Sequence, residues 1–373
     1  MRVAIVHDWL TNLGGGERVV EALSQAFPEA PIYTSVYDSS GIDLFDKKEV
    51  ISSFLQGWPM AKSRHQLYPM LRRYAFESFD FSEYDVVISS SSAEAKGIIT
   101  STETIHISYI HTPTRYYWSG YQDYLNSPGL GIFNPLAKIV LPRVVKNMRS
   151  WDYAAAQRPD CLLANSKTVQ GRISKYYHRD SQIIFPPAEL DRFDVTDTKK
   201  DGDYYLVVSR LIPYKRVDLA VQACSELNKR LIVVGDGSER VKLQNISSNT
   251  VEFIENADDK LVAKLYSGCK AFIFTAYEDF GITPVEAMAS GVPVITYGYG
   301  GASESVVDNE TGVFFGTQSV DSLKEAIIRF EQMKFSKSTI RKQADKFSKT
   351  RFIQEVTDLV NNKYEQKHFK QTK

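Results

Sequence analysis

Long apolar runs are missing from this 373-residue sequence, and cysteine is scarce. No stretch holds the ~18 consecutive apolar residues that a membrane-spanning helix needs, so none is expected. The first residues, MRVAIVHDWL, read as a strand and lack the long apolar stretch of a signal peptide. Cys161, Cys224 and Cys269 lie in apolar or helical contexts without metal-ligand spacing. They are typical of small core residues in a reducing compartment.

An excess of charge of either sign is also missing. Lys and Arg number 45, and Asp and Glu number 45, so the formal net charge is zero. Because a dedicated nucleic-acid-binding protein usually carries a large basic excess, we expect no nucleic-acid partner. These features favour a cytoplasmic protein, either free or held peripherally on the inner face of the cell membrane.

Short apolar runs alternate with amphipathic helical patterns along the whole chain. YYLVVSR, RLIVVGDG, AFIFTAY and PVITYG read as buried strands, whereas RVDLAVQACSELN reads as a helix. This alternation predicts parallel sheets that are covered by helices on both faces. The length suits two domains rather than one.

The strand–helix pattern restarts after FPPAELDRFDVTDTKKDGD, which contains prolines and then many charges. We therefore expect an α/β protein with two doubly wound, Rossmann-like domains joined near residues 187–202. The predicted N-terminal domain spans residues 1–187 and the C-terminal domain residues 188–350. Residues 351–373 are expected to form a helix that packs back on the first domain.

Two common nucleotide-binding motifs are missing as well. G-x-G-x-x-G does not follow the first strand, GDGSER at 235–240 matches it only in part, and no Walker A sequence occurs. Hydride transfer and P-loop hydrolysis are therefore disfavoured. Instead, TNLGGGERVVEAL places Gly14–Gly16 before an amphipathic helix. Such a turn lets a backbone approach an anion at the helix N-terminus, although a plain glycine turn has the same sequence.

Two acids lie in YEDFGITPVEAMASG, residues 277–291. Glu278 follows a strand-like run, at the carboxyl end where open α/β sheets place ligand groups. TPVE reads as a helix start with Thr283 as N-cap, Pro284 at the first position and Glu286 completing a capping box. Gly291 would end that helix. A ligand role is favoured for Glu278, whereas Glu286 is equally suited to capping and to ligand binding.

Cations and a histidine follow other strands. Arg210 and Lys215 come after YYLVVS, where fixed cations suit a leaving diphosphate, and each alone would also suit a surface ion pair. His111 follows IHISYI and precedes a proline; a structural and a catalytic role are equally compatible with this position. Asp201 and Asp203 have the form of a D-x-D metal motif, but they lie in the charged linker, so we expect a turn without metal.

Residues 54–76, FLQGWPMAKSRHQLYPMLRRYAF, mix apolar and basic side chains. The blend is typical of an interfacial amphipathic segment, and also of an ordinary helix and loop that cover the core. The apolar members are Trp58, Leu67, Tyr68, Met70 and Leu71, and the basic ones are Lys62, Arg64, Arg72 and Arg73. Lys138, Arg143, Lys146 and Arg149 would extend the basic face.

GGGE, SRLIPYKR and EDFGITPVEAMASG together resemble the retaining GT-B glycosyltransferases of family 4, over nearly the whole chain. Glu278 and Glu286 match the E-x7-E arrangement of that family. HTPTRYYW and EDFGITPVEA further resemble bacterial mannosyltransferases that build surface polysaccharides. The resemblance implies a GT-B fold with the active site in the cleft between two domains. It also implies transfer of a hexose, mannose from GDP-mannose, with retention onto a lipid-linked or growing surface glycan.

The resemblance also implies residue roles. Glu278 would hold sugar hydroxyls and support the positive charge developing at the anomeric carbon, and Glu286 would bind the ribose hydroxyls. His111 would lie near the sugar and acceptor. The implied phosphate contacts are Gly15, Gly16, Arg210, Lys215 and the backbone of Gly281, Ile282 and Thr283. Phe280 is also implied to bind the donor, and the implied base contacts are Phe253 and Ile254. The implied catalytic residues are Glu278, His111, Arg210 and Lys215.

No cofactor and no metal are required by the resemblance. The implied partners are a nucleotide-sugar donor and a glycan or polyprenyl-linked acceptor. Two alternatives remain open: a nucleotide-sugar 2-epimerase of the same fold, and a catalytically inactive nucleotide-sugar-binding subunit. The E-x7-E pair together with Arg210 and Lys215 favours transfer.

Overall fold

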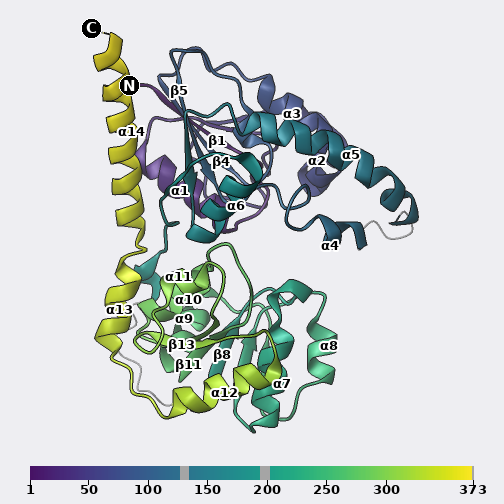
Figure 1. Cartoon of the computed structure of the whole chain (residues 1–373), viewed down its shortest axis with the longest axis vertical. Coiled ribbons are helices and arrows are strands. Elements are labelled where there is room, and N and C mark those ends of the chain that lie inside the picture. Colours follow the sequence, from purple (N-terminus) through teal and green to yellow (C-terminus); the bar gives the residue numbers. More distant parts are fainter. Residues whose placement is uncertain (127–133, 194–201, 372–373) are drawn as a thin grey trace. The chain divides into compact units, whose positions relative to one another are not determined.

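The structure is a computed structural model that describes residues 1–126, 134–193 and 202–371 (Figure 1). It divides into two compact units. The first unit contains Met1–Phe185 and Phe352–Lys373, and the second contains Pro186–Arg351. Of the linker predicted at 187–202, residues 194–201 lie outside the described residues.

The first unit is built on a seven-stranded parallel sheet in the order β3-β2-β1-β4-β5-β6-β7. Its strands are β1 (Val3–His7), β2 (Ile32–Thr34), β3 (Val50–Ser52), β4 (Val86–Ser91), β5 (Ile105–Ile110), β6 (Cys161–Ala164) and β7 (Gln182–Ile183). Its helices are α1 (Gly15–Ala26), α2 (Ala61–Arg64), α3 (Pro69–Glu77), α4 (Tyr121–Asn126), α5 (Asn134–Ala155) and α6 (Lys167–Tyr177), with 3-10 turns η1 (Phe54–Gly57), η2 (His65–Leu67) and η3 (Ala95–Gly97).

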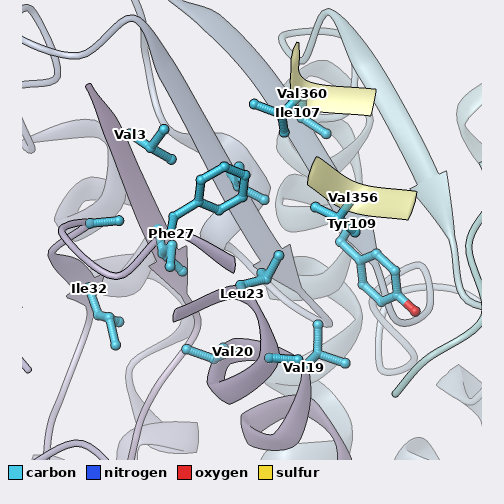
Figure 2. Packing of buried hydrophobic residues seen from close by; sticks show 14 of the residues in the cluster. Val3, Val19, Val20, Leu23, Phe27, Ile32, Ile107, Tyr109, Val356 and Val360 are labelled. Atoms are coloured by element: carbon cyan, nitrogen blue, oxygen red, sulfur yellow. The ribbon is translucent and has the colours of Figure 1, made fainter. Parts of the chain in front are cut away.

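Both faces of this sheet are buried, which explains the continuous apolar runs of its strands. Successive residues of a strand point to opposite faces. Accordingly, Val3 and Ile5 of β1 join one core cluster, whereas Ala4 and Val6 join another. Figure 2 shows the first of these clusters, in which residues of α1 and of the C-terminal helix meet the strands.

The C-terminal helix, α14 (Lys349–Gln371), begins in the second unit and continues in the first. Phe352, Val356 and Val360 recur every four residues, so they form one apolar stripe along the helix. All three are buried in the core cluster that also contains Val19 and Leu23 of α1. Figure 2 shows Val356 and Val360 in this cluster. The stripe therefore completes the apolar core of the first unit.

The second unit has a six-stranded parallel sheet in the order β10-β9-β8-β11-β12-β13. Its strands are β8 (Tyr205–Val208), β9 (Leu231–Val234), β10 (Val251–Ile254), β11 (Ala271–Phe274), β12 (Val294–Tyr297) and β13 (Gly312–Phe315). Its helices are α7 (Val217–Glu226), α8 (Arg240–Asn245), α9 (Asp259–Gly268), α10 (Ile282–Ala289), α11 (Ala302–Ser305), α12 (Val320–Glu331) and α13 (Lys337–Asp345), with 3-10 turns η5 (Leu190–Phe193) and η6 (Pro213–Lys215).

Each sheet reverses its strand order at one point, between β1 and β4 in the first unit and between β8 and β11 in the second. Sheets of this kind bind ligands outside the carboxyl ends of the strands at that point. The prediction of two doubly wound, Rossmann-like domains is confirmed. A ligand site is therefore expected at the loops that follow β1, β4, β8 and β11.

None of the helices in the described ranges combines the length and the apolar character that crossing a membrane requires.

Candidate active site

An ion pair spans the reversal point of the second sheet. Lys215 ends the loop after β8, and Glu278 follows β11. The Nζ atom of Lys215 lies 2.5 Å from Oε1 of Glu278, and their side chains are only 17% and 13% exposed. Because β8 and β11 are neighbours in the sheet, two residues 63 positions apart are brought together at its carboxyl edge. The predicted cation and the predicted acid therefore belong to one site.

Hydrogen bonds fasten the loop after β8 to the end of β11. The hydroxyl of Thr275 donates to the carbonyl oxygen of Lys215 at 2.9 Å. The side-chain amide of Gln318 in turn donates to the carbonyl oxygen of Thr275 at 2.8 Å. Lys215 thus extends from a backbone that is tied to the strand carrying Glu278.

Arg210, the other predicted cation, is exposed on the same loop. Its guanidinium donates to the hydroxyl of Tyr214 at 3.1 Å, and the Nζ of Lys215 lies 5.5 Å from the centre of the Tyr214 ring. One tyrosine therefore contacts both cations. Two cations beside a carboxylate can bind a diphosphate while the acid remains available to a neutral sugar.

Backbone packing positions the turn between the two acids. Gly281 has a φ of +85°, a conformation that a side chain disfavours. The N–H of Gly301 donates to the carbonyl oxygen of Glu278 at 2.8 Å. A Cβ atom on Gly301 would overlap the backbone of Asp279 and Phe280. The turn after β11 is therefore held against the glycine-rich turn after β12.

The helix after this turn starts earlier than predicted. The structure places the N-cap at Gly281 without a side-chain capping bond, so the prediction of Thr283 as N-cap is wrong. Pro284 then falls at the third helical position, and Glu286 at the fifth, too far along for a capping box. Helix geometry leaves the N–H groups of Ile282 and Thr283 without intrahelical acceptors, so they are available to an anion. Gly291 has a φ of +73° just after the helix, as predicted for its end.

Glu286 lies beside a buried tyrosine. The Tyr266 hydroxyl donates to Oε2 of Glu286 at 3.4 Å. Burial, and then the charge of Glu286, raises the pKa of Tyr266 well above its ordinary value, so this hydroxyl remains a donor. Burial lowers the pKa of Arg192, but the neighbouring acids Glu189 and Asp259 raise it by more, so the pKa is raised overall. The charge of Glu286 contributes to this increase. Glu286 thus belongs to a polar cluster instead of a helix cap.

The two residues that are expected to contact the nucleotide base lie at the end of β10, the edge strand of the second sheet. Phe253 and Ile254 are both half-buried. Strands are spaced about 4.8 Å apart, so three spacings separate β10 from β11 by about 14 Å. A ligand that reached both Phe253 and Glu278 would have to lie extended across the ends of four strands.

A second polar group occurs at the reversal point of the first sheet. His7 ends β1, and its Nδ1–H donates to the carbonyl oxygen of its β4 neighbour Ser90 at 3.0 Å. His111 follows β5, and its Nε2 lies 2.8 Å from the Ser90 hydroxyl. A Cβ on Gly16 would lie 3.2 Å from the His7 ring and 3.6 Å from Nε2 of His111. The predicted residues Gly16 and His111 are therefore close neighbours. Gly15 is exposed.

His7 pairs with Glu17 in the first turn of α1. Nε2 of His7 lies 3.7 Å from Oε1 of Glu17, and both side chains are buried. Burial alone lowers the pKa of His7, but the hydrogen bond and charge of Glu17 outweigh it, so the pKa is raised. Burial likewise raises the pKa of Glu17, and His7 more than reverses this, so that pKa is lowered. Each partner therefore favours the charged form of the other.

The segment 54–76 is only partly as predicted. Trp58, Leu67 and Met70 are exposed, as are Lys62 and Arg64. Arg72, predicted on the basic face, is instead buried, with Nε donating to Glu94 at 2.8 Å. Arg149, predicted to extend that face, is half-buried, and its Nε donates to the carbonyl oxygen of Tyr117 at 2.8 Å. Buried hydrogen-bond acceptors outcompete solvent for these two guanidinium groups.

Across residues 1–126, 134–193 and 202–371, no three His, Cys, Asp or Glu side chains cluster closely enough to hold a metal ion. Asp201 of the D-x-D sequence lies outside the described residues, whereas Asp203 is exposed and pairs with Lys270.

Several residues of these sites were missed by sequence reasoning. His7, Glu17 and Ser90 lie in different elements, and only the β1–β4 pairing brings His7 and Ser90 together. Gly301 becomes informative only once its contact with the Glu278 turn is known. One feature of the sequence could have indicated His7 and Glu17, because they lie on either side of the glycine turn at Gly14–Gly16.

Comparison with known proteins is consistent with this geometry. Residues 190–350 match the family described as Glycosyl transferases group 1. An uncharacterized glycosyltransferase of Methanocaldococcus jannaschii is 22% identical over 354 residues, 94% of this chain and 93% of that protein. A GDP-mannose-dependent alpha-mannosyltransferase of Mycolicibacterium smegmatis is 36% identical over 190 residues, 48% of this chain and 50% of that protein.

Solved structures extend the likeness to the whole fold. The chain resembles Anabaena HepE in complex with UDP, with a TM-score of 0.72 and 17% identity over 97% of this chain and 100% of the other. It also resembles a sucrose-phosphate synthase of Thermosynechococcus elongatus, with a TM-score of 0.70, 16% identity, and coverage of 98% and 99%. These likenesses show that the two-domain fold is shared along nearly the whole chain. The sequence relatives and the fold together support glycosyltransferase activity in a GT-B protein.

Proposed function

We propose that the chain is a retaining hexosyltransferase of family 4 that transfers mannose from GDP-mannose to a lipid-linked or growing surface glycan. The observation that carries the proposal is the Lys215–Glu278 pair at the reversal point of the second sheet. The pair presents a cation for a diphosphate and an acid for a sugar at the edge where such sheets bind ligands. The mannose-specific part is supported by the similarity to the GDP-mannose-dependent enzyme.

The second unit provides a group for each part of a nucleotide sugar. Lys215 and Arg210 stabilise the negative charge of the leaving diphosphate, together with the N–H groups at the start of α10. Glu278 holds sugar hydroxyls and stabilises positive charge at the anomeric carbon. Glu286 accepts hydrogen bonds from the ribose, and Phe253 and Ile254 contact the base. This chemistry needs neither a metal nor a cofactor.

In the first unit, Gly15 and Gly16 offer backbone N–H groups to phosphate at the start of α1. His111 lies near the sugar and acceptor. The acceptor-side role of this unit is supported by the half-buried His111 beside Gly16 and by the open space at Gly15.

Calorimetry with GDP and UDP tests the donor. We expect GDP to bind more tightly, and at 100 times its dissociation constant it should add about 2.7 kcal/mol to the free energy of unfolding. Lys215→Met should weaken GDP binding. Lys229→Met is the matched control, because Lys229 forms an ion pair with Glu331 in the same unit. Clearly tighter UDP binding would exclude the GDP-mannose donor while leaving a hexosyltransferase in place.

Transfer assays separate this function from its alternative, the 2-epimerase. With GDP-mannose and a polyprenyl-linked glycan acceptor, we expect a product whose NMR spectrum shows an α linkage, the configuration of the donor. An epimerase would instead consume the nucleotide sugar without any acceptor. Binding without turnover of either kind would indicate an inactive subunit.

We further propose that residues 54–76 hold the protein on an anionic membrane surface. Six exposed apolar side chains support this: Phe54, Trp58, Met60, Leu67, Met70 and Tyr74. Lys62 and Arg64 lie exposed among them, and each basic side chain near such a surface contributes about 1 kcal/mol. Lys138, Arg143 and Lys146 of α5 are exposed as well.

Co-sedimentation with phosphatidylserine liposomes at low salt tests this surface. Lys62→Glu/Arg64→Glu should release the protein from the liposomes. Lys260→Glu/Lys264→Glu, which reverses two exposed charges on α9, should not. If both double variants sediment like the wild type, the segment only covers the core.

A further inference from the structure

A row of hydrogen-bonding groups crosses the carboxyl ends of three neighbouring strands of the first sheet. It runs from Glu17 through His7 and Ser90 to His111. His7 ends β1, Ser90 lies near the end of β4 and His111 directly follows β5. Glu17, His7 and Ser90 are buried, whereas His111 is half-buried. Because the first three groups are buried, their hydrogen bonds must be satisfied within the row, which includes His111.

The proton positions on His7 follow from its partners. A backbone carbonyl can only accept, so the Nδ1 atom of His7, 3.0 Å from the Ser90 carbonyl oxygen, carries a proton. The same nitrogen lies 3.2 Å from the Ser90 hydroxyl oxygen. Its N–H is therefore shared between two acceptor atoms of one residue. On the other side of the ring, the Glu17 carboxylate faces Nε2.

The hydroxyl of Ser90 then has one acceptor to which it can donate a hydrogen bond. Its polar neighbours in the part of the chain that the structure describes are Nδ1 of His7 and Nε2 of His111. Since Nδ1 of His7 is a donor, the hydroxyl hydrogen must go to Nε2 of His111, 2.8 Å away. If Nε2 of His111 also carried a proton, the buried hydroxyl would face two donors and its own hydrogen would have no acceptor, which is unfavourable.

We propose that Ser90, oriented by the His7–Glu17 pair, fixes His111 as the neutral tautomer that carries its proton on Nδ1. The histidine tautomer is thus assigned from its hydrogen-bond network. Ser90 is a positioning residue, because it acts on the ligand only through His111. Other titratable groups near the row are Asp8, after β1, and His65 on η2.

For the proposed transfer reaction, this assignment has a consequence for His111. A neutral Nδ1–H imidazole with its Nε2 occupied by Ser90 is a hydrogen-bond donor to a sugar oxygen and has no basic nitrogen left for the ligand. His111 therefore orients the sugar or acceptor and does not remove a proton. This consequence rests on the proposed function, whereas the tautomer itself does not.

Long-range ¹H–¹⁵N correlation NMR of the ¹⁵N-labelled full chain tests the tautomer. The protein has six histidines, and a His111→Gln variant identifies the His111 signals. At pH 7.5 we expect His111 as the Nδ1–H form in the wild type. In Ser90→Ala the Nε2–H form should become populated, and in Ser90→Thr, which restores the hydroxyl, it should disappear again.

A neighbouring serine is the matched control. Ser89 is also buried on β4, and its hydroxyl lies 2.8 Å from Nε2 of another histidine, His106. Ser89→Ala should leave the His111 signals unchanged and should alter those of His106. An Nε2–H form of His111 in the wild type, or identical His111 signals in Ser90→Ala and the wild type, would overturn the proposal.

Transfer assays add the kinetic arm. Ser90→Ala should lower kcat about tenfold without changing nucleotide affinity, and Ser90→Thr should recover it. Unchanged kcat in a Ser90→Ala protein whose tautomer has shifted would refute the role of His111 as an oriented donor. If no transfer occurs in the wild type although the NMR result holds, the proposed function fails and the tautomer assignment stands.

Discussion

At the scale of single residues, the two acids of EDFGITPVEAM differ in their surroundings. Glu278 forms a largely buried ion pair with Lys215, at a strand end. Glu286, on helix α10 after that strand end, accepts a hydrogen bond from the Tyr266 hydroxyl. A carboxylate beside a cation at the ligand edge is placed to respond to charge that develops during a reaction. A carboxylate among hydroxyl and guanidinium groups is placed to accept hydrogen bonds from a ligand.

The two acids should therefore give opposite kinetic signatures. Glu278→Gln should lower the single-turnover rate at saturating donor by roughly 10²–10³, the usual loss for one preorganised electrostatic contact. Its nucleotide affinity should hardly change. Glu286→Gln should weaken nucleotide binding by about tenfold, because an amide accepts hydroxyl hydrogen bonds less well than a carboxylate.

Nucleotide calorimetry beside rapid-quench kinetics measures both effects. Glu310→Gln, an exposed acid of the same unit, is the control and should match the wild type in both. Normal turnover by Glu278→Gln, or unaltered nucleotide affinity in Glu286→Gln, would contradict this division of roles.

Gly15 allows a separate test at the residue scale. A Cβ at this position meets no atom within 4 Å, so Gly15→Ala costs the folded protein no contact. Alanine also favours the helix that begins here, by up to about 1 kcal/mol relative to glycine. If phosphate approaches this backbone, Gly15→Ala should nevertheless lower donor affinity. Thermal unfolding and donor titration are the measurements; unchanged donor affinity would remove Gly15 from the site.

At the scale of elements, turns and helix starts position the side chains of the second unit. The turn carrying Glu278 is packed against the turn after β12, where Gly300 has a φ of +87° and its Cβ would lie 2.9 Å from the Glu278 carbonyl oxygen. Neighbouring parallel strands end at the same edge, so their turns support one another there. The geometry of Glu278 thus depends on residues that never contact it through a side chain.

Gly301→Ala should disturb this support without removing any functional group. A methyl group there overlaps the backbone of Asp279 and Phe280, so we expect a loss of about 1–3 kcal/mol in the free energy of unfolding, as for other overpacked positions. Turnover should fall as well. Gly316→Ala is the matched control, since its methyl group meets no atom within 4 Å. Equal stability and turnover of the two variants would show that the turn adapts freely.

At the scale of the whole molecule, titratable imidazole is confined to one unit. All six histidines, His7, His65, His106, His111, His178 and His368, belong to the first unit. Burial, assisted by Arg158, lowers the pKa of His106 to about 3. Burial, assisted by Arg72, lowers the pKa of His65 to about 4. The second unit has no side chain of this type.

Mild acid should therefore destabilise the first unit selectively. Below pH 6.5, the ordinary histidine pKa, His65 and His106 are protonated in the unfolded chain but remain neutral in the folded unit. Stability is thus fully present above pH 6.5 and is lost as the pH falls toward the two lowered values. Each of the two histidines contributes a slope of up to about 1.4 kcal/mol per pH unit. His7 has a raised pKa, so its contribution is present below 6.5 and is lost as the pH rises through that raised value.

Hydrogen exchange read by mass spectrometry between pH 7 and pH 5 measures this difference. Peptides from β4 and β5 should lose protection on acidification, whereas peptides from β11 and β12 serve as the internal control. His106→Gln should make the decline in the first unit shallower. Equal declines in both units would refute the prediction.

The sequence by itself determined the fold class and most of the candidate residues of the second unit. Alternating apolar runs and amphipathic helices require parallel sheets that are covered on both sides. Arg210, Lys215 and Glu278 could be recognised because each directly follows a strand, and parallel strands end at one edge. These signals are local in the chain, so they can be read without the structure.

Tertiary structure alone decided which of these residues meet and which are taken up by packing. Strand pairing joins Lys215 to Glu278 and His7 to Ser90, across many residues of sequence. Arg72 is buried, so it does not belong to the predicted basic face. Helix α10 begins directly after Gly281, so Thr283 is not its N-cap. Periodicity shows which face of an element is apolar. It does not show which buried acceptor will form a hydrogen bond with an arginine, or which glycine will adopt a positive φ. Those outcomes depend on contacts between segments distant in sequence, and such contacts exist only in the folded chain.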